Sequence, residues 1–145
     1  MKRLIFPSFS ALFMLLVFNS CNKVDFGANA SILSKKSRLC NDWLLFQISD
    51  ASGNPIDSIG YSENLVIKRD GTFEKTSSLF QNSISTNLSS ISGLWRFAFE
   101  KESLVLMNVT RNINIEYDIV RLSNTELIIQ DEKTKMSYHY LPNEK

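Results

Sequence analysis

The residues best suited to hold a ligand are aromatic, and three of them alternate along one segment. Trp95, Phe97 and Phe99 are spaced two apart, so an extended strand would place them on one face. Tyr117 and Tyr138 lie in later segments that alternate in the same way. The interior of an eight-stranded barrel is just wide enough to be filled by side chains or to hold one small ligand. Together with Phe73, these residues are predicted either to fill a barrel core or to line a site for a small apolar ligand, and the five are the predicted ligand-binding residues.

Residues that could act as acids, bases, nucleophiles or metal ligands show no spacing that would combine them. His139 is the single histidine, stands between two tyrosines, and is expected to face outward or to line a barrel mouth. A lone histidine needs partners before it can catalyse. Glu116 and Asp118 could form an acid pair in a wet cavity, or lie on the outside of a sheet. No Cys/His spacing predicts a zinc site. We therefore expect a protein that is not an enzyme and has no cofactor or metal.

The chain that must position these residues has an all-β pattern from Leu39 onward. Short stretches rich in β-branched and aromatic residues alternate with turn signals, which is typical of an all-β domain. Asp70-Gly71 predicts a tight hairpin in which both residues take positive φ. The clearest alternation begins at Ile113, where every second residue is isoleucine or tyrosine. Strands are predicted at about 42–48, 64–69, 72–77, 93–99, 103–109, 113–121, 126–130 and 136–141.

Seven or eight strands joined mostly by tight turns predict an antiparallel up-and-down meander. Residues 78–91 are rich in serine and asparagine and stay undecided between a mobile loop, a further strand and one helical turn. An open meander exposes two sheet edges, and closure into a barrel removes them. A closed barrel is the predicted fold, and an open sandwich is the alternative.

The amino terminus has the three parts of an export signal. Two cations precede an apolar run from Leu4 to Phe18, and the small residue Ser20 follows. The run is about 15 residues long and is interrupted by Pro7, whereas a membrane-spanning helix needs roughly 20 apolar residues. We expect residues 1–20 to be removed as a signal peptide.

The charge balance argues against nucleic acid as a partner. The chain has 16 basic and 15 acidic residues, and two of the basic ones lie within residues 1–20, so the mature net charge is near −1. Such a chain has no electrostatic footprint for nucleic acid. Residues 21–38 are predicted to form a tether, in which Lys35, Lys36 and Arg38 stay solvated or face lipid headgroups. Residues 39–145 are expected to form one domain.

The segment Phe18-Asn19-Ser20-Cys21 resembles the lipobox of bacterial lipoproteins, in which a small residue precedes a lipid-modified cysteine. That family prefers Leu or Val three places before the cysteine, where this chain has Phe18. The resemblance implies a lipid on Cys21, cleavage before it, and anchoring to a membrane through acyl chains. The alternative is a secreted protein with a chance cysteine. Asn22, in place of aspartate, resembles lipoproteins released to the outer membrane, which is the expected location in the cell envelope.

Cys40 would then have no intramolecular partner. Its neighbours Leu39 and Trp43 favour a buried thiol that packs as a small hydrophobe. A reactive thiol or an intermolecular bridge is the alternative.

Four local patterns between about residues 39 and 141 resemble the lipocalin-like domains of small Gram-negative lipoproteins. They are the opening strand with Trp43, the Asp70-Gly71 hairpin followed by Thr72-Phe73, Gly93-Leu94-Trp95 with Leu104-Val105-Leu106, and the segment 117–123 leading into 126–129. Asn41 stands where that family has a glycine. The resemblance implies a lipocalin-like barrel, in which Arg121 would pack over Trp43 through a cation–π contact.

The expected function follows from this resemblance. We expect a non-enzymatic, membrane-anchored lipoprotein that binds a small apolar ligand or a lipid in or near its barrel. The alternative is a packed barrel that contacts an envelope protein or a glycan through loops 49–63 and 78–92. A cavity lined by the aromatic residues would favour the first, and a conspicuous exposed apolar patch would favour the second.

Overall fold

A computed structural model describes residues 34–81 and 84–144. The predicted signal peptide, Cys21 and most of the predicted tether lie outside these residues. Within the described ranges, no helix has the length and apolar character needed to cross a membrane. The elements are α1 (Lys35–Leu39), β1 (Asp42–Ser49), β2 (Pro55–Ile56), β3 (Tyr61–Ile67), β4 (Thr72–Gln81), β5 (Ile84–Ala98), a 3₁₀ turn (Phe99–Lys101), β6 (Ser103–Asn108), β7 (Ile113–Leu122), β8 (Leu127–Asp131) and β9 (Ser137–Pro142).

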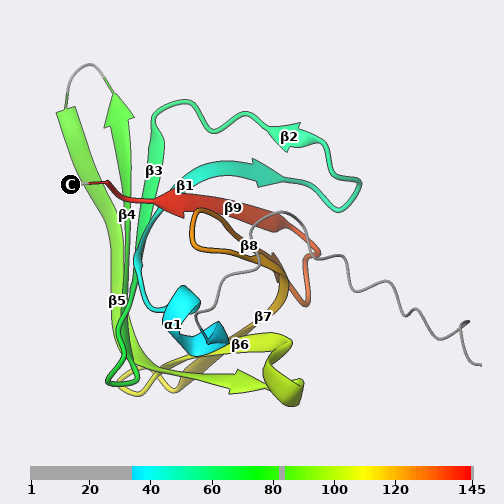
Figure 1. Ribbon diagram of the computed structural model, residues 1–145. Coiled ribbons are helices and arrows are strands. Elements are labelled where there is room, and N and C mark those ends of the chain that lie inside the picture. Colours follow the sequence, from blue (N-terminus) through cyan, green and yellow to red (C-terminus); the bar gives the residue numbers. More distant parts are fainter. Residues whose placement is uncertain (1–33, 82–83, 145) are drawn as a thin grey trace, which may run out of the picture. The chain divides into compact units, whose positions relative to one another are not determined.

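The strands form one antiparallel sheet in the order β2-β1-β3-β4-β5-β6-β7-β8-β9. β1 also pairs with β9, with Trp43 opposite Pro142, so that eight strands close into a barrel and β2 is an extra strand on β1 (Figure 1). From β3 to β9 each strand pairs with the next one along the chain. The predicted all-β meander and its closure are confirmed.

The core lies inside the barrel and takes alternate residues from its strands. Trp43, Leu65, Leu104 and Leu127 are fully buried. The Nε1–H of Trp43 donates to the carbonyl oxygen of Leu39 at 2.9 Å, so its polar group is satisfied within the core. Complete burial stabilises the fold by about 1.5–3 kcal/mol for each large apolar side chain.

The β3–β4 hairpin occurs where the sequence predicts it, but the turn differs from the expected one. Gly71 has a φ of 91°, whereas Asp70 is not among the residues with positive φ. Lys68 and Thr72 close a three-residue loop with the glycine in the left-handed position. The carboxyl group of Asp70 accepts hydrogen bonds from the hydroxyl and the N–H of Thr72, at 2.7 and 2.9 Å, and these bonds lower its pKa.

Gly93 is needed where β5 first meets β6. The Leu94–Met107 pair begins the ladder between these strands. A Cβ atom at residue 93 would lie 2.0 Å from the carbonyl oxygen of Met107, which is far inside van der Waals contact. The glycine therefore allows the two backbones to approach each other.

The undecided segment 78–91 is a strand hairpin. β4 continues to Gln81 and β5 begins at Ile84, and the two pair along their whole length. A register shift between Ser77 and Ser78 leaves Leu88 as an extra residue on β5. The hairpin projects past the neighbouring strands (Figure 1), and residues 84–90 are all exposed.

The structure differs from the predicted tether at residues 35–38, which belong to α1. Ser34 caps this helix by accepting a hydrogen bond from the N–H of Ser37 at 3.2 Å. The helix contacts three turns: Lys35 pairs with Glu102 at 3.1 Å, Ser37 accepts from Arg69 at 2.9 Å, and Arg38 donates to the Leu122 carbonyl oxygen at 3.2 Å. These turns, β5–β6, β3–β4 and β7–β8, all lie at one end of an up-and-down barrel, so α1 covers that end.

The alternation predicted for β7 holds over its centre and shifts by one residue near its end. Tyr117 is buried, and Ile115 and Ile119 pack against the core. A register shift follows Ile119, so that Val120 is exposed and Leu122 faces the core. A bulge of this kind bends a strand and resets which face each residue occupies.

Candidate functional site

Four of the five predicted ligand-site residues lie inside the barrel as two ring pairs. Trp95 and Phe97 meet edge to face with centroids 5.4 Å apart, and Tyr117 and Tyr138 do so at 6.1 Å. The Nε1–H of Trp95 donates to the carbonyl oxygen of Lys68 at 2.8 Å. These rings pack against the buried core.

Phe99 does not join the other four. Residues Phe99, Glu100 and Lys101 have φ values of 44°, 54° and 75°, so the strand alternation ends at Ala98. The Phe99 side chain is 74% exposed. Spacing alone predicted it on the face of Trp95 and Phe97, but the left-handed turn directs it to solvent.

The interior also contains an ion pair, which was not predicted from the sequence. Glu63 is 2% exposed, and its Oε1 lies 2.9 Å from the Nζ of Lys75. Glu63 precedes Leu65 on the inward face of β3, and Lys75 follows Phe73 on the inward face of β4. A buried charge is costly unless it is paired and hydrogen-bonded.

Hydroxyl groups satisfy the remaining acceptors of Glu63. Tyr140 donates to its Oε1, while Tyr61 and Ser77 donate to its Oε2 at 2.7 and 3.2 Å. The Nζ of Lys75 lies 5.9 Å from the ring centroid of Tyr117 and 5.5 Å from that of Tyr138, within cation–π range. Together, buried and partly buried residues form one interior polar cluster: Tyr61, Glu63, Lys75, Ser77, Tyr117, Tyr138 and Tyr140.

Opposing effects set the ionisation of this cluster. Burial raises the pKa of Glu63, but the charge of Lys75 and the hydrogen bonds from Tyr140 and Tyr61 outweigh it and leave the pKa below its usual value. Burial, followed by the negative charge of Glu63, raises the pKa of Tyr117 and Tyr140. At neutral pH these tyrosines therefore stay protonated, and Tyr140, together with Tyr61, donates to a charged carboxylate.

An apolar cavity of about 180 Å³ lies beside this cluster. Ile91, which lines it, pairs directly with Lys75 across the β4–β5 ladder. Asn108 and Arg111 belong to the end of β6 and the β6–β7 turn, at the opposite end of the barrel from α1. The apolar lining consists of Phe73, Ile91, Leu106, Ile113 and Ile115.

Of the aromatic set, Phe73 lines this cavity, whereas the five predicted ligand-binding residues do not. The sequence signal that could have located the cluster beside it was the alternation of β3. Glu63 stands two residues before Leu65, in the phase of Leu65 and Ile67. The predicted strand covers about residues 64–69, whereas β3 begins at Tyr61, so the prediction leaves Glu63 outside the strand.

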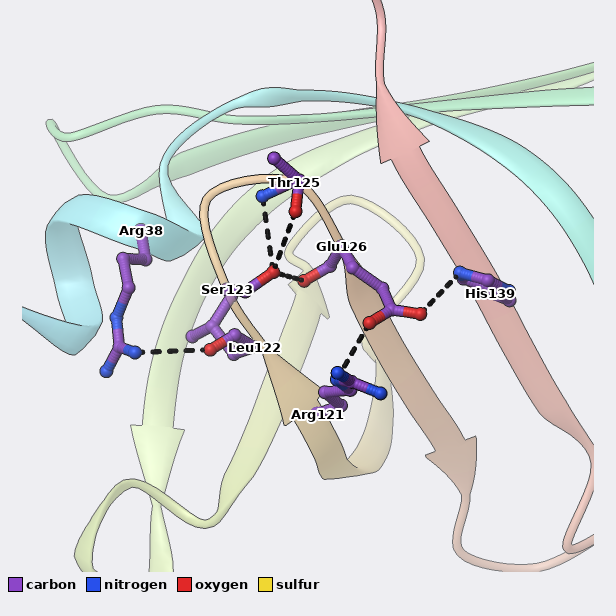
Figure 2. A network of polar contacts seen from close by, with 7 residues as sticks. All are labelled: Arg38, Arg121, Leu122, Ser123, Thr125, Glu126 and His139. Carbon is purple, nitrogen blue, oxygen red and sulfur yellow. Dashed lines mark hydrogen bonds and ion pairs between the residues drawn. The ribbon is translucent and has the colours of Figure 1, made fainter. Parts of the chain in front are cut away.

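His139 lies on the outer face of the barrel, one of its two predicted positions. Its Nε2 is 2.9 Å from Oε1 of Glu126, and its ring packs edge to face on Phe46. Figure 2 shows the other oxygen of Glu126 paired with the Nε of Arg121 at 2.7 Å. The predicted packing of Arg121 over Trp43 is wrong, because the Arg121 side chain is 67% exposed and Trp43 is fully buried.

The remainder of the network in Figure 2 organises the β7–β8 turn. The hydroxyl of Ser123 accepts from the N–H of Thr125 at 3.2 Å and donates to the carbonyl oxygen of Glu126 at 3.4 Å. Arg38 binds the neighbouring Leu122 carbonyl oxygen from α1. These contacts join a turn, a helix and two strands, which is a structural role.

The predicted carboxylate pair also lies on the outer face. Glu116 stands opposite Val105 and lines a surface cleft of about 480 Å³ with Arg96 and Lys133. Asp118 accepts a hydrogen bond from the Ser103 hydroxyl at 3.3 Å. Of the two positions weighed for this pair, the structure shows the outside of the sheet.

Cys40 packs against the core and is a free thiol. Burial raises the pKa of this thiol, which favours its protonated form at neutral pH. The thiol packs as the predicted small hydrophobe, but it is partly rather than fully buried.

Comparison with known proteins supports the fold. No family model and no curated protein matches the chain. A lipocalin-like protein from Bacteroides uniformis matches with a TM-score of 0.52 and 13% identity, over 72% of this chain and 98% of that one. A second protein from Bacteroides uniformis matches with a TM-score of 0.54 and 11% identity, over 76% of this chain and 93% of that one. The chain has a lipocalin-like barrel fold.

Proposed function

We propose that this chain is a binding protein whose barrel takes up a small apolar ligand in the cavity beside Ile91. The observation that carries the proposal is the composition of the cavity wall, in which five of the seven residues are apolar side chains. A cavity of roughly 150 Å³ lined by Leu, Ile and Phe stays dry and binds benzene. A volume of about 180 Å³ therefore suits one aromatic ring or a short branched alkyl group.

The position of the cavity supports entry from one end of the barrel. Ile113 lines the cavity and is also 47% exposed, so the wall reaches the surface there. Arg111 and Asn108 border the same region and could bind a polar group of the ligand. α1 covers the opposite end of the barrel, which leaves the β6–β7 end as the route.

A titration of residues 22–145 with toluene, monitored by ligand-detected NMR, tests this proposal. We expect saturable binding by the wild type and at least about tenfold weaker binding by Ile113→Trp, because the larger ring would occupy the mouth. Val109→Trp is the matched control, since Val109 is exposed in the same turn but does not line the cavity. Absence of binding by the wild type, or equal loss in both variants, would contradict the proposal.

We further propose that the barrel is held in the cell envelope, at the outer membrane, by acyl chains on Cys21. The support is the export signal and the lipobox-like segment that ends at this cysteine. Each buried methylene contributes about 0.8 kcal/mol, so two or three acyl chains give a stable anchor. Ligand uptake would then take place next to a membrane.

Metabolic labelling with an alkyne fatty acid tests the anchor. Cells that express the wild type should yield a labelled protein in the outer-membrane fraction. Cys21→Ser should lose both label and membrane association, because the thiol is the acylation site. Cys40→Ser is the control and should keep the label. Label retained in Cys21→Ser, or an unlabelled wild type, would rule out this anchor.

A further inference from the structure

The β5 strand has a long edge that no described strand covers. β6 pairs with β5 only from Leu94 to Ala98 and its Met107 lies against Gly93, so the same edge from Ile84 to Ser92 has no strand partner among the described residues. The other edge of this segment is paired with β4 throughout. Unpaired backbone donors and acceptors in an extended strand are a template for another strand.

The backbone groups on this edge can be identified. The N–H of Trp95 donates to the Gly71 carbonyl oxygen, on the β4 side of the strand. Alternate residues of a strand direct their backbone groups to opposite sides, so those of Ser90 and Ser92 point away from β4. The register is regular between Ser89 and Leu94, beyond the bulge at Leu88.

This edge lacks the features that usually protect an edge from pairing. Lysine, proline and inward-facing charges are the common protections. The chain is 21% charged, yet no charged residue and no proline occurs from Thr76 to Trp95. By contrast, the short outer strand β2 carries Pro55. The bulge at Leu88 limits the flat part of the β5 edge without covering it.

We propose that this edge pairs with the same edge of a second copy of the chain, antiparallel about a two-fold axis. An uncharged strand can face its own copy without repulsion, and the serines and threonines can pair across the junction. The exposed side chains of Ile84 and Leu88 are available for apolar contact with the second copy. A two-fold pairing uses the edge of both copies at once, so assembly stops at a dimer.

Cysteine scanning of the full chain in cell membranes tests this pairing. Single cysteines replace Ser85, Thr86, Asn87, Ser89, Ser90 and Ser92 in turn, and disulfide-linked dimer is measured on non-reducing gels. A disulfide needs Cα atoms roughly 4.4–6.8 Å apart. In a two-fold pair, the two copies of one position move apart along the strand by about 7 Å for each residue that lies between that position and the axis. Linkage should therefore peak at one position and fall to background within two residues.

Controls separate this pairing from random collision. The unsubstituted chain, which keeps Cys21 and Cys40, gives the background, and Thr110→Cys and Thr125→Cys place thiols in other exposed turns. Adding Ser90→Lys should lower linkage at the peak by about tenfold, since two like charges would meet at the junction. Ser90→Pro should do the same without unfolding the barrel, because it removes a donor that no described strand uses.

Three outcomes would overturn the proposal. Linkage at control level across the scan would show that the edges do not meet. Linkage that is unaffected by Ser90→Lys and Ser90→Pro would show a contact of another kind. Linkage of the same positions to a different protein would show a heterologous strand as the occupant. The test does not involve the cavity, so its result is independent of ligand binding.

Discussion

Glu63 and Lys75 place two opposite charges where a small barrel ordinarily has apolar side chains. Removing both from water costs several kcal/mol, and the pair is tolerated because its geometry is close and its remaining acceptors are satisfied. Tyr61, Ser77 and Tyr140 supply those hydrogen bonds. The cluster therefore fixes one arrangement of β3, β4 and β9 inside the barrel.

Glu63→Gln should strongly destabilise the barrel at neutral pH. The substitution leaves Lys75 buried without its counter-charge, and loss of one partner of a buried pair costs about 3–5 kcal/mol. Urea unfolding of the domain measures this loss. Glu102→Gln, in the exposed pair with Lys35, should cost less than about 1 kcal/mol. The double variant Glu63→Gln/Lys75→Met should recover much of the stability.

The difference in unfolding free energy between the wild type and Glu63→Gln should depend on pH. Folding lowers the pKa of Glu63, so its ionised form stabilises the native state. This contribution is complete above the carboxyl group's unfolded pKa and is lost as the pH falls through its lower folded pKa. The difference in unfolding free energy between wild type and Glu63→Gln should therefore shrink in acid. A difference that stays constant down to pH values below the folded pKa would contradict this role for the carboxylate.

At the scale of elements, the close approach of β5 and β6 depends on Gly93. Gly93→Ala would place a Cβ atom 2.0 Å from the Met107 carbonyl oxygen and 2.9 Å from its carbon. Because both are backbone atoms, the strands must separate, and we expect a loss of about 1–3 kcal/mol. The midpoint of urea unfolding measures it. Ser92→Ala, at the exposed neighbouring position, should stay within about 0.5 kcal/mol of wild type, and equal midpoints for both variants would refute the role of Gly93.

Most strands could be predicted because alternation and turn residues are local signals. The β7 pattern and the Asp70-Gly71 hairpin are the clearest cases. The segment 78–91 could not be decided, because serine and asparagine have weak strand propensity and only the partner strand fixes their conformation. α1 was missed because Lys35, Lys36 and Arg38 resemble a solvated tether, and its contacts are with turns distant in the sequence.

At the scale of the whole molecule, closure and burial depend on residues that are far apart in the chain. The sequence predicted the barrel because a meander of this length would otherwise expose two edges. It could not locate the cavity, whose wall comes from four strands and a turn. Nor could it locate the ion pair, because no local pattern indicates that Glu63 and Lys75 face each other. Matching folds at 11–13% identity show how few positions this architecture constrains.

The pairing of β1 with β9 also bears on the order in which the barrel forms. Trp43 stands opposite Pro142, and the N–H of Asn143 donates to the Asp42 carbonyl oxygen at 2.9 Å. Contacts between residues so distant in the chain slow folding, because a long loop must be closed before they form. A nascent chain can complete its hairpins one by one, but the barrel stays open until Pro142 has been synthesised. Until then β1 and β8 are bare edges, and this is the interval in which the chain most needs protection from aggregation.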